Sequence, residues 1–188
     1  DKDLDFDIMS YIIDKVHKDL LHNFFVKDSD IFSSNDLDRM LALQYIMTLL
    51  ATMIEGEYFH RVSKNERYLE DYNGEFDSAY LYEEYLVKIV SFINSLNVKN
   101  DTIWFSKTSM FTLIIELQKF IVHNKYDDFS KINKEYLLKE LNDLDRRYHL
   151  YFSNKDNYKE VNDGEILYFQ GSRQGVNDIE PRKNRGQV

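Results

Sequence analysis

Apolar residues recur with helical spacing along most of the chain, and the clearest case is Asn35–Glu55. Its apolar positions cover an arc too wide for a surface helix, so they predict a largely buried helix on which the other apolar stripes pack. Ser34 and Asn35 are suited to cap its start, and Gly56 is placed to end it. We therefore expect this stretch to be the helix around which the chain is organised.

The same periodicity predicts further helices on both sides of this stretch. The alternation that a sheet requires is missing, because Thr102–Phe105 is too short to build one. We predict an all-α fold, an irregular helical bundle of about five long helices plus one or two short ones, with a basic C-terminal tail. The other predicted helices are Asp5–Phe25, Lys64–Tyr72, Ser78–Leu96, Ser106–Val122, Asn133–Phe152 and Val161–Phe169.

The composition agrees with one helical domain or one domain with an appendage. Of the 188 residues 43% are hydrophobic, and only six glycines and one proline are present to interrupt helices. The absence of cysteine excludes disulfides and thiolate metal sites. No run of about 18 apolar residues and no cationic leader occur, so we expect a cytoplasmic protein with no membrane partner. Because the chain starts at Asp1 rather than Met, we expect it to be part of a longer protein.

The charge is unevenly distributed along the chain. The net charge of −9 argues against the surface as a whole being a nucleic-acid footprint. Within residues 171–188, however, Arg and Lys outnumber Asp and Glu by two, which leaves −11 on the remainder. We therefore predict a helical domain over residues 1–170 and a basic tail or junction segment of a larger protein over residues 171–188. Such asymmetry can mark a contact surface.

Metal-ligating residues are few. The pairs Asp14-x-x-His17 and Glu57-x-x-His60 have the spacing with which a helical bundle holds two iron ions. One pair has Asp in place of Glu, and the other spans the predicted helix end after Gly56. We interpret both pairs as solvated polar residues rather than iron ligands, and we predict no metal site.

Other charged clusters favour solvated helix faces over catalysis. Adjacent Glu83 and Glu84 point about 100° apart on a helix and do not converge on one substrate atom. The run Asp143–Arg147 is typical of a charged helix face. Glu165–Gly171 (EILYFQG) matches the site of a tag-removing viral protease, but the residues after it do not resemble a tag. No phosphate loop or nucleophile elbow is present, so we predict no catalytic residues.

Three stretches carry a resemblance to a known family. The segment Arg39–Gly56 with Glu66–Tyr72 resembles a long helix followed by a short one. Farther along, Phe105-x-Lys107-x-Ser109-x-Phe111 resembles a helix start, and residues 171–185 read Gly-Ser-x-x-Gly-x-Asn-Asp followed by Arg-x-x-Arg. In this order they resemble the helical C-terminal half of the N-terminal domain of GmrSD-type restriction endonucleases.

The resemblance implies a supporting function. The hallmark of the family, an Asp-Gly-Gln-Gln-Arg motif in an N-terminal lobe, is linked to nucleotide hydrolysis or nuclease action and is absent from this chain. By this resemblance, the chain would be a non-catalytic part of a longer bacterial anti-phage protein, the parent. Its partner would be the missing N-terminal lobe, and DNA would be bound through the parent. It would hold no cofactor itself, whereas the parent would use a nucleoside triphosphate with a divalent metal.

The resemblance also implies a set of nucleotide- or DNA-contacting residues near the C-terminus. Glycines there can expose backbone N–H groups, and arginines three residues apart can bind phosphate or carboxylate. Val176 stands where the family usually has Thr. A solvated chain end, a stand-alone helical protein-interaction module and a His/carboxylate metalloenzyme remain as alternatives. The implied contact residues are Gly171, Ser172, Gly175, Asn177, Asp178, Arg182 and Arg185.

Overall fold

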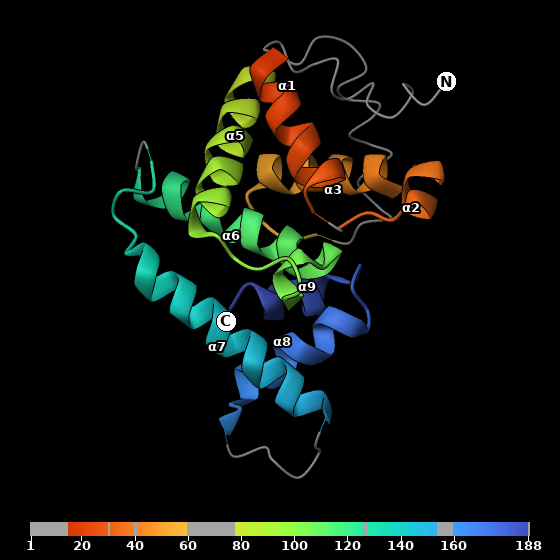
Figure 1. Cartoon of the computed structure of the whole chain (residues 1–188), viewed down its shortest axis with the longest axis vertical. Coiled ribbons are helices and arrows are strands. Elements are labelled where there is room, and N and C mark those ends of the chain that lie inside the picture. Colours follow the sequence, from red (N-terminus) through yellow and green to blue (C-terminus); the bar gives the residue numbers. More distant parts are fainter. Residues whose placement is uncertain are drawn as a thin grey trace.

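A computed structural model describes residues 15–29, 31–39, 41–59, 78–125, 128–153 and 160–187, and within these ranges every regular element is helical (Figure 1). This confirms the predicted all-α bundle. The elements are α1 (Lys15–His22), the π-helical turn η3 (Asn23–Lys27), α2 (Ser34–Asp38), α3 (Leu41–Glu55), α5 (Ala79–Leu96), the 3-10 turn η4 (Ile103–Phe105), α6 (Lys107–Asn124), α7 (Lys134–Ser153), α8 (Asp163–Arg173) and α9 (Ile179–Arg185).

The predicted helix Asn35–Glu55 forms as two helices, α2 and α3. Its cap is Ser33 rather than Ser34 or Asn35. The Ser33 hydroxyl accepts a hydrogen bond from the Asp36 N–H at 3.2 Å, and the Asp36 carboxylate accepts one from the Ser33 N–H at 2.9 Å. This reciprocal pair is a capping box. Gly56 has φ +71°, so the helix ends at the predicted glycine.

Several predictions fall outside the described residues. They are the helix Lys64–Tyr72, the first part of the helix Asp5–Phe25, and one residue from each candidate metal-binding pair, Asp14 and His60. Helices α5, α6 and α7 start and end within a few residues of the predicted positions. None of the helices in the described ranges is both long and apolar enough to cross a membrane.

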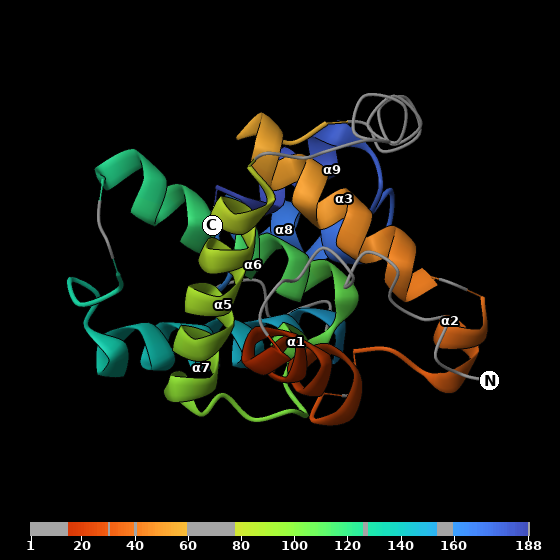
Figure 2. The ribbon, with the colours of Figure 1, turned by 90° about the horizontal axis from the view of Figure 1, so that it is seen from above.

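Helix α6, rather than α3, is the central helix of the bundle. It contacts α3, α5, η4 and α9, and Figures 1 and 2 show it between α3 and α5 on one side and α7, α8 and α9 on the other. The sequence of α6 does not reveal this burial, because the polar residues Ser109, Thr112 and Gln118 interrupt its apolar pattern. All three are nevertheless buried. The Thr112 hydroxyl donates to the Thr108 carbonyl at 3.1 Å, and Gln118 Nε2 donates to the Met53 carbonyl at 3.2 Å.

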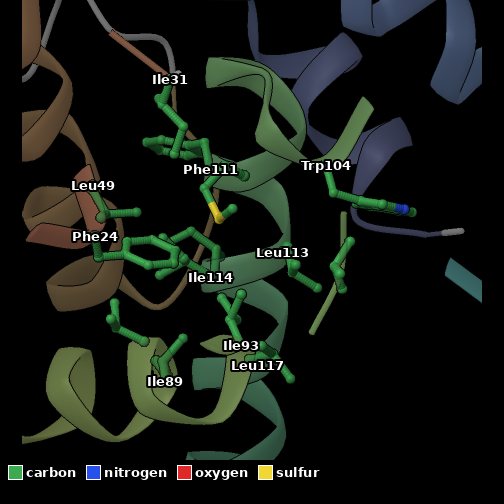
Figure 3. Close-up of a cluster of buried hydrophobic side chains, with 14 of the residues drawn as sticks. Phe24, Ile31, Leu49, Ile89, Ile93, Trp104, Phe111, Leu113, Ile114 and Leu117 are labelled. Atoms are coloured by element: carbon green, nitrogen blue, oxygen red, sulfur yellow. The ribbon is translucent and has the colours of Figure 1, made fainter. Parts of the chain in front are cut away.

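The core therefore forms on two sides of α6 (Figure 3). Phe111 and Ile114 lie toward Leu49 of α3, whereas Leu113 lies on the side of Trp104. Burying a side chain of this size stabilises the fold by roughly 1.5–3 kcal/mol. Trp104 also fixes α7, because its Nε1 donates to the Leu141 carbonyl at 2.9 Å.

Two charged clusters are less solvated than predicted. Glu83 is 6% exposed, so the expectation of a solvated Glu83–Glu84 face is wrong for Glu83, while Glu84 pairs with Lys88 at 2.8 Å. The face at Asp143–Arg147 is charged as predicted, yet it also makes tertiary contacts. The Ile103 N–H donates to Asp145 at 2.8 Å, and Arg147 pairs with the buried Glu165 at 2.8 Å. Hydrophobic periodicity does not report such pairings.

Candidate functional site

The C-terminal segment packs as a helical hairpin of α8 and α9 against α6. An Asn162–Glu165 capping box starts α8, which continues to Arg173, so residue 171, the predicted start of the tail, lies inside a helix. The EILYFQG sequence is part of α8, and its Tyr168 and Phe169 are 2% and 0% exposed. This segment is therefore part of the core rather than an appended sequence.

The small residues of the predicted contact set shape the hairpin. A Cβ atom on Gly171 would lie 3.2 Å from the Pro181 carbonyl oxygen, which is tighter than most such contacts, so glycine favours this close approach of α8 and α9. The Ser172 hydroxyl donates to the Phe169 carbonyl of its own helix at 2.8 Å. Gly175 has φ +59° in the turn between the helices. These three residues therefore serve the path of the backbone through the hairpin.

Arg185 lies inside the protein and is 3% exposed. Its Nη1 donates to the Gly171 carbonyl at 2.6 Å and its Nη2 to the Val176 carbonyl at 3.2 Å. Its Nε donates to the Thr112 hydroxyl at 3.2 Å. The side chain therefore ties the end of α8 and the following turn to α6, through neutral oxygen atoms.

Arg182 lies one helical turn earlier on the same inward face of α9 and is 4% exposed. Its Nη1 donates to the Phe59 carbonyl at 3.1 Å, which connects α9 to the segment after α3. Its guanidinium carbon lies 4.8 Å from the centre of the Phe111 ring, a cation–π geometry. Both predicted arginines thus face inward from one helix.

Among the described residues, the three groups that accept hydrogen bonds from Arg185 are neutral. Burial lowers the pKa of the Arg185 guanidinium, since taking a cation out of water disfavours the charged form. Burial also raises the pKa of Tyr58, and raises that of Tyr168 to about 12, so these neighbouring phenols stay neutral at pH 7.

A pocket of about 210 Å³ opens beside the two arginines, between α3, α6 and α9. We call it the arginine pocket. Lys107 at its edge donates to Asp36 at 2.6 Å, and this hydrogen bond, together with that from Ser33, lowers the pKa of Asp36 to about 2. None of the described residues that line the pocket is acidic. They are Leu41, Tyr45, Thr48, Lys107, Thr108, Phe111, Val176, Asn177, Arg182 and Arg185.

All three family-like stretches of the sequence contribute to this pocket. Leu41, Tyr45 and Thr48 come from the first, Lys107 and Phe111 from the second, and Val176 to Arg185 from the third. Stretches separated by more than half the chain therefore meet at one place.

The predicted contact set and the pocket overlap only in part. Asn177, Arg182 and Arg185 line the pocket, whereas Gly171, Ser172, Gly175 and Asp178 are not among its lining residues. Tyr45 also lines the pocket but was not among the predicted contact residues, because in the sequence it resembles an ordinary core residue of its helix.

A second cavity, of about 560 Å³, lies between α6, α7 and α8, and Arg185 lines this one as well. Its other lining residues include Trp104, Glu140 and Tyr168. Across the described ranges, no three His, Asp or Glu side chains gather closely enough to hold a metal ion.

Comparison with known proteins gives no match, neither to a family model nor to a curated protein nor to a solved structure.

Proposed function

We propose that this chain is the non-catalytic helical portion of a bacterial restriction or anti-phage defence protein, supporting an N-terminal lobe that hydrolyses nucleotide or cleaves nucleic acid. One observation carries the proposal: the three stretches that resemble the GmrSD-type family line a single pocket.

The chemistry of the pocket fits support and binding rather than catalysis. Its charged lining residues are Lys107, Arg182 and Arg185, which are hydrogen-bond donors only. Such groups hold an anionic partner but do not act as a general base at neutral pH. In the intact protein the lobe would supply the nucleotide, the divalent metal and the contact with DNA, in the cytoplasm.

The test uses the intact gene product, with its upstream residues, in cells challenged with phage. Alanine at both arginines would be a poor probe because both side chains are buried in the bundle. Lys107→Gln with Asn177→Ala instead changes the more exposed pocket lining. We expect this pair to abolish phage protection and to reduce nucleotide hydrolysis, with the protein level unchanged.

Lys139→Gln with Asn142→Ala, two exposed positions on α7, is the matched control and should retain protection. Upstream residues without an Asp-Gly-Gln-Gln-Arg motif, or an intact protein that gives no protection, would rule out the proposal. That outcome would favour the stand-alone protein-interaction module.

A further inference from the structure

We infer that the arginine pocket binds a phosphate-type oxyanion, such as the terminal phosphate of a nucleotide. This inference deepens the proposed function by naming a ligand class for the same site. It rests on that function only for the biological source of the phosphate, since binding is measured on this chain alone.

The lining of the arginine pocket is positively charged. The chain carries a net charge of −9, yet the described lining of the pocket contains three cations and no acid. Lys107 is already paired with Asp36, but the hydrogen bonds of Arg185 go to two carbonyls and a hydroxyl. A buried cation held by neutral groups is costly, and an anion beside it would offset that cost.

The side chains at the pocket can donate further hydrogen bonds. A guanidinium carries five N–H groups, and each Nη atom of Arg185 has a second N–H besides the one that bonds a carbonyl. The Tyr45 hydroxyl is buried at the pocket without a hydrogen-bond partner among the described residues. Tyr45 and Arg182 both line the pocket. Burial raises the pKa of Tyr45, and the charge of Arg182 opposes the rise. An oxyanion supplies the acceptors that these donors need.

The pocket also lies at the N-terminal end of a long helix. Lys107 and Thr108 are the first two residues of the 18-residue helix α6, so the pocket lies at the positive end of the helix dipole. Anions are stabilised there by the dipole and by the first N–H groups of the helix. The dipole thus adds to the effect of the two arginines.

The size of the pocket restricts the ligand. About 210 Å³ greatly exceeds the roughly 10–15 Å³ that one water molecule needs, but lies below the roughly 300–1,000 Å³ of pockets that enclose drug-sized ligands. The pocket therefore suits a phosphate group, with any attached nucleoside outside it. An internal phosphate of duplex DNA suits it less, because the rest of this acidic protein would face the duplex.

Isothermal titration calorimetry on the 188-residue chain tests this directly, at low salt and with a chelator present. The ligands are pyrophosphate, ATP, adenosine and a short DNA duplex. We expect saturable binding of pyrophosphate and ATP with similar affinity, weakening as salt rises, and no binding of adenosine. Failure to bind pyrophosphate, or ATP binding without pyrophosphate binding, overturns the inference. Tighter binding of the duplex than of pyrophosphate assigns the pocket to the DNA backbone instead and also overturns it.

Tyr45→Phe is the decisive variant because it removes only the hydroxyl. The unpartnered hydroxyl does not help the fold, so this variant should unfold at the same temperature as the wild type or higher. Its affinity for pyrophosphate should fall about tenfold, the effect of one hydrogen bond to a charged group. Tyr168→Phe, the same change in the second cavity, is the control and should bind like the wild type.

Equal affinity of the wild type and Tyr45→Phe, or an equal loss in Tyr168→Phe, would remove the pocket as the site. If the chain binds pyrophosphate as expected but the intact parent gives no phage protection, the inference stands and the proposed function is rejected. If the parent gives phage protection but the chain does not bind pyrophosphate, the proposed function stands and the inference is rejected.

Discussion

Helices α3 and α9 both place side chains in the interior, but for opposite reasons. The sequence of α3, LALQYIMTLLATMIE, contains one charged residue, and its Leu49 and Met53 are 0% and 2% exposed. The sequence of α9, IEPRKNR, is mostly charged, yet Arg182 and Arg185 are 4% and 3% exposed. Removal of apolar surface from water stabilises the first helix, and hydrogen bonds from guanidinium groups to carbonyls hold the second.

The difference shows which kind of burial can be recognised in a sequence. Apolar burial leaves a periodic pattern in the helix itself. The burial of Arg185 depends on oxygen atoms of Gly171, Val176 and Thr112, which no local pattern connects to it. A basic segment predicted as a tail can therefore be an integral part of the bundle.

The largest effect should come from the apolar side of this comparison. Leu49→Ala leaves a cavity against α6, and we expect it to lower the free energy of unfolding by about 4 kcal/mol. Urea denaturation followed by circular dichroism measures this change. Leu81→Ala, at a position 44% exposed on α5, should change it by less than about 0.5 kcal/mol. Similar losses in the two variants would mean that α3 does not pack in the core as described.

The next largest effect should come from the polar side. Arg185→Met keeps much of the side-chain volume but leaves one buried and one partly buried carbonyl without their donor. We therefore expect the free energy of unfolding to fall by about 3 kcal/mol. Lys183→Met, at an exposed position of the same helix, is the matched control. Equal denaturation midpoints for the two variants would contradict the structural role of Arg185.

A smaller effect is expected at two glycines, Gly56 at the end of α3 and Gly175 in the turn that leads into α9. Gly56 and Gly175 both have positive φ, +71° and +59°. Alanine at Gly56 meets no atom within 4 Å and should cost about 1 kcal/mol from backbone strain alone. Alanine at Gly175 also approaches Pro181 Cγ to 3.2 Å and should cost about 2 kcal/mol. Thermal unfolding of both variants gives the difference, and a reversed order would contradict the turn geometry.

The last effect depends on pH and concerns Asp36 in α2. Its pKa lies at about 2 in the folded protein, below the ordinary 3.8, so its contribution to stability is complete above pH 3.8 and disappears as the pH falls through 2. We expect urea midpoints to fall across this window more steeply for the wild type than for Asp36→Asn. Glu135→Gln, at an exposed position on α7, should follow the wild type. Parallel curves for wild type and Asp36→Asn would contradict the bond to Lys107.

Much of the bundle follows from the sequence, but the central helix and the pocket do not. The stripes of α5, α6 and α7, the start of α6 near Ser106 and the stop at Gly56 were predictable from periodicity and local backbone preferences. The central position of α6 was not, because its buried polar residues interrupt the apolar pattern. The arginine pocket combines residues such as Thr48 and Asn177 that only the folded chain brings together. Local patterns predict elements, whereas a site depends on how the elements cross.

Trp104 gives the chain a built-in optical reporter. It is the only tryptophan, it is 5% exposed, and its indole N–H is bonded to the backbone of α7. An indole in such an apolar site should fluoresce at shorter wavelength than one in water, and undocking of α7 should shift the emission to the red. Because Trp104 lines the second cavity rather than the arginine pocket, its emission can follow unfolding while a ligand is titrated into that pocket.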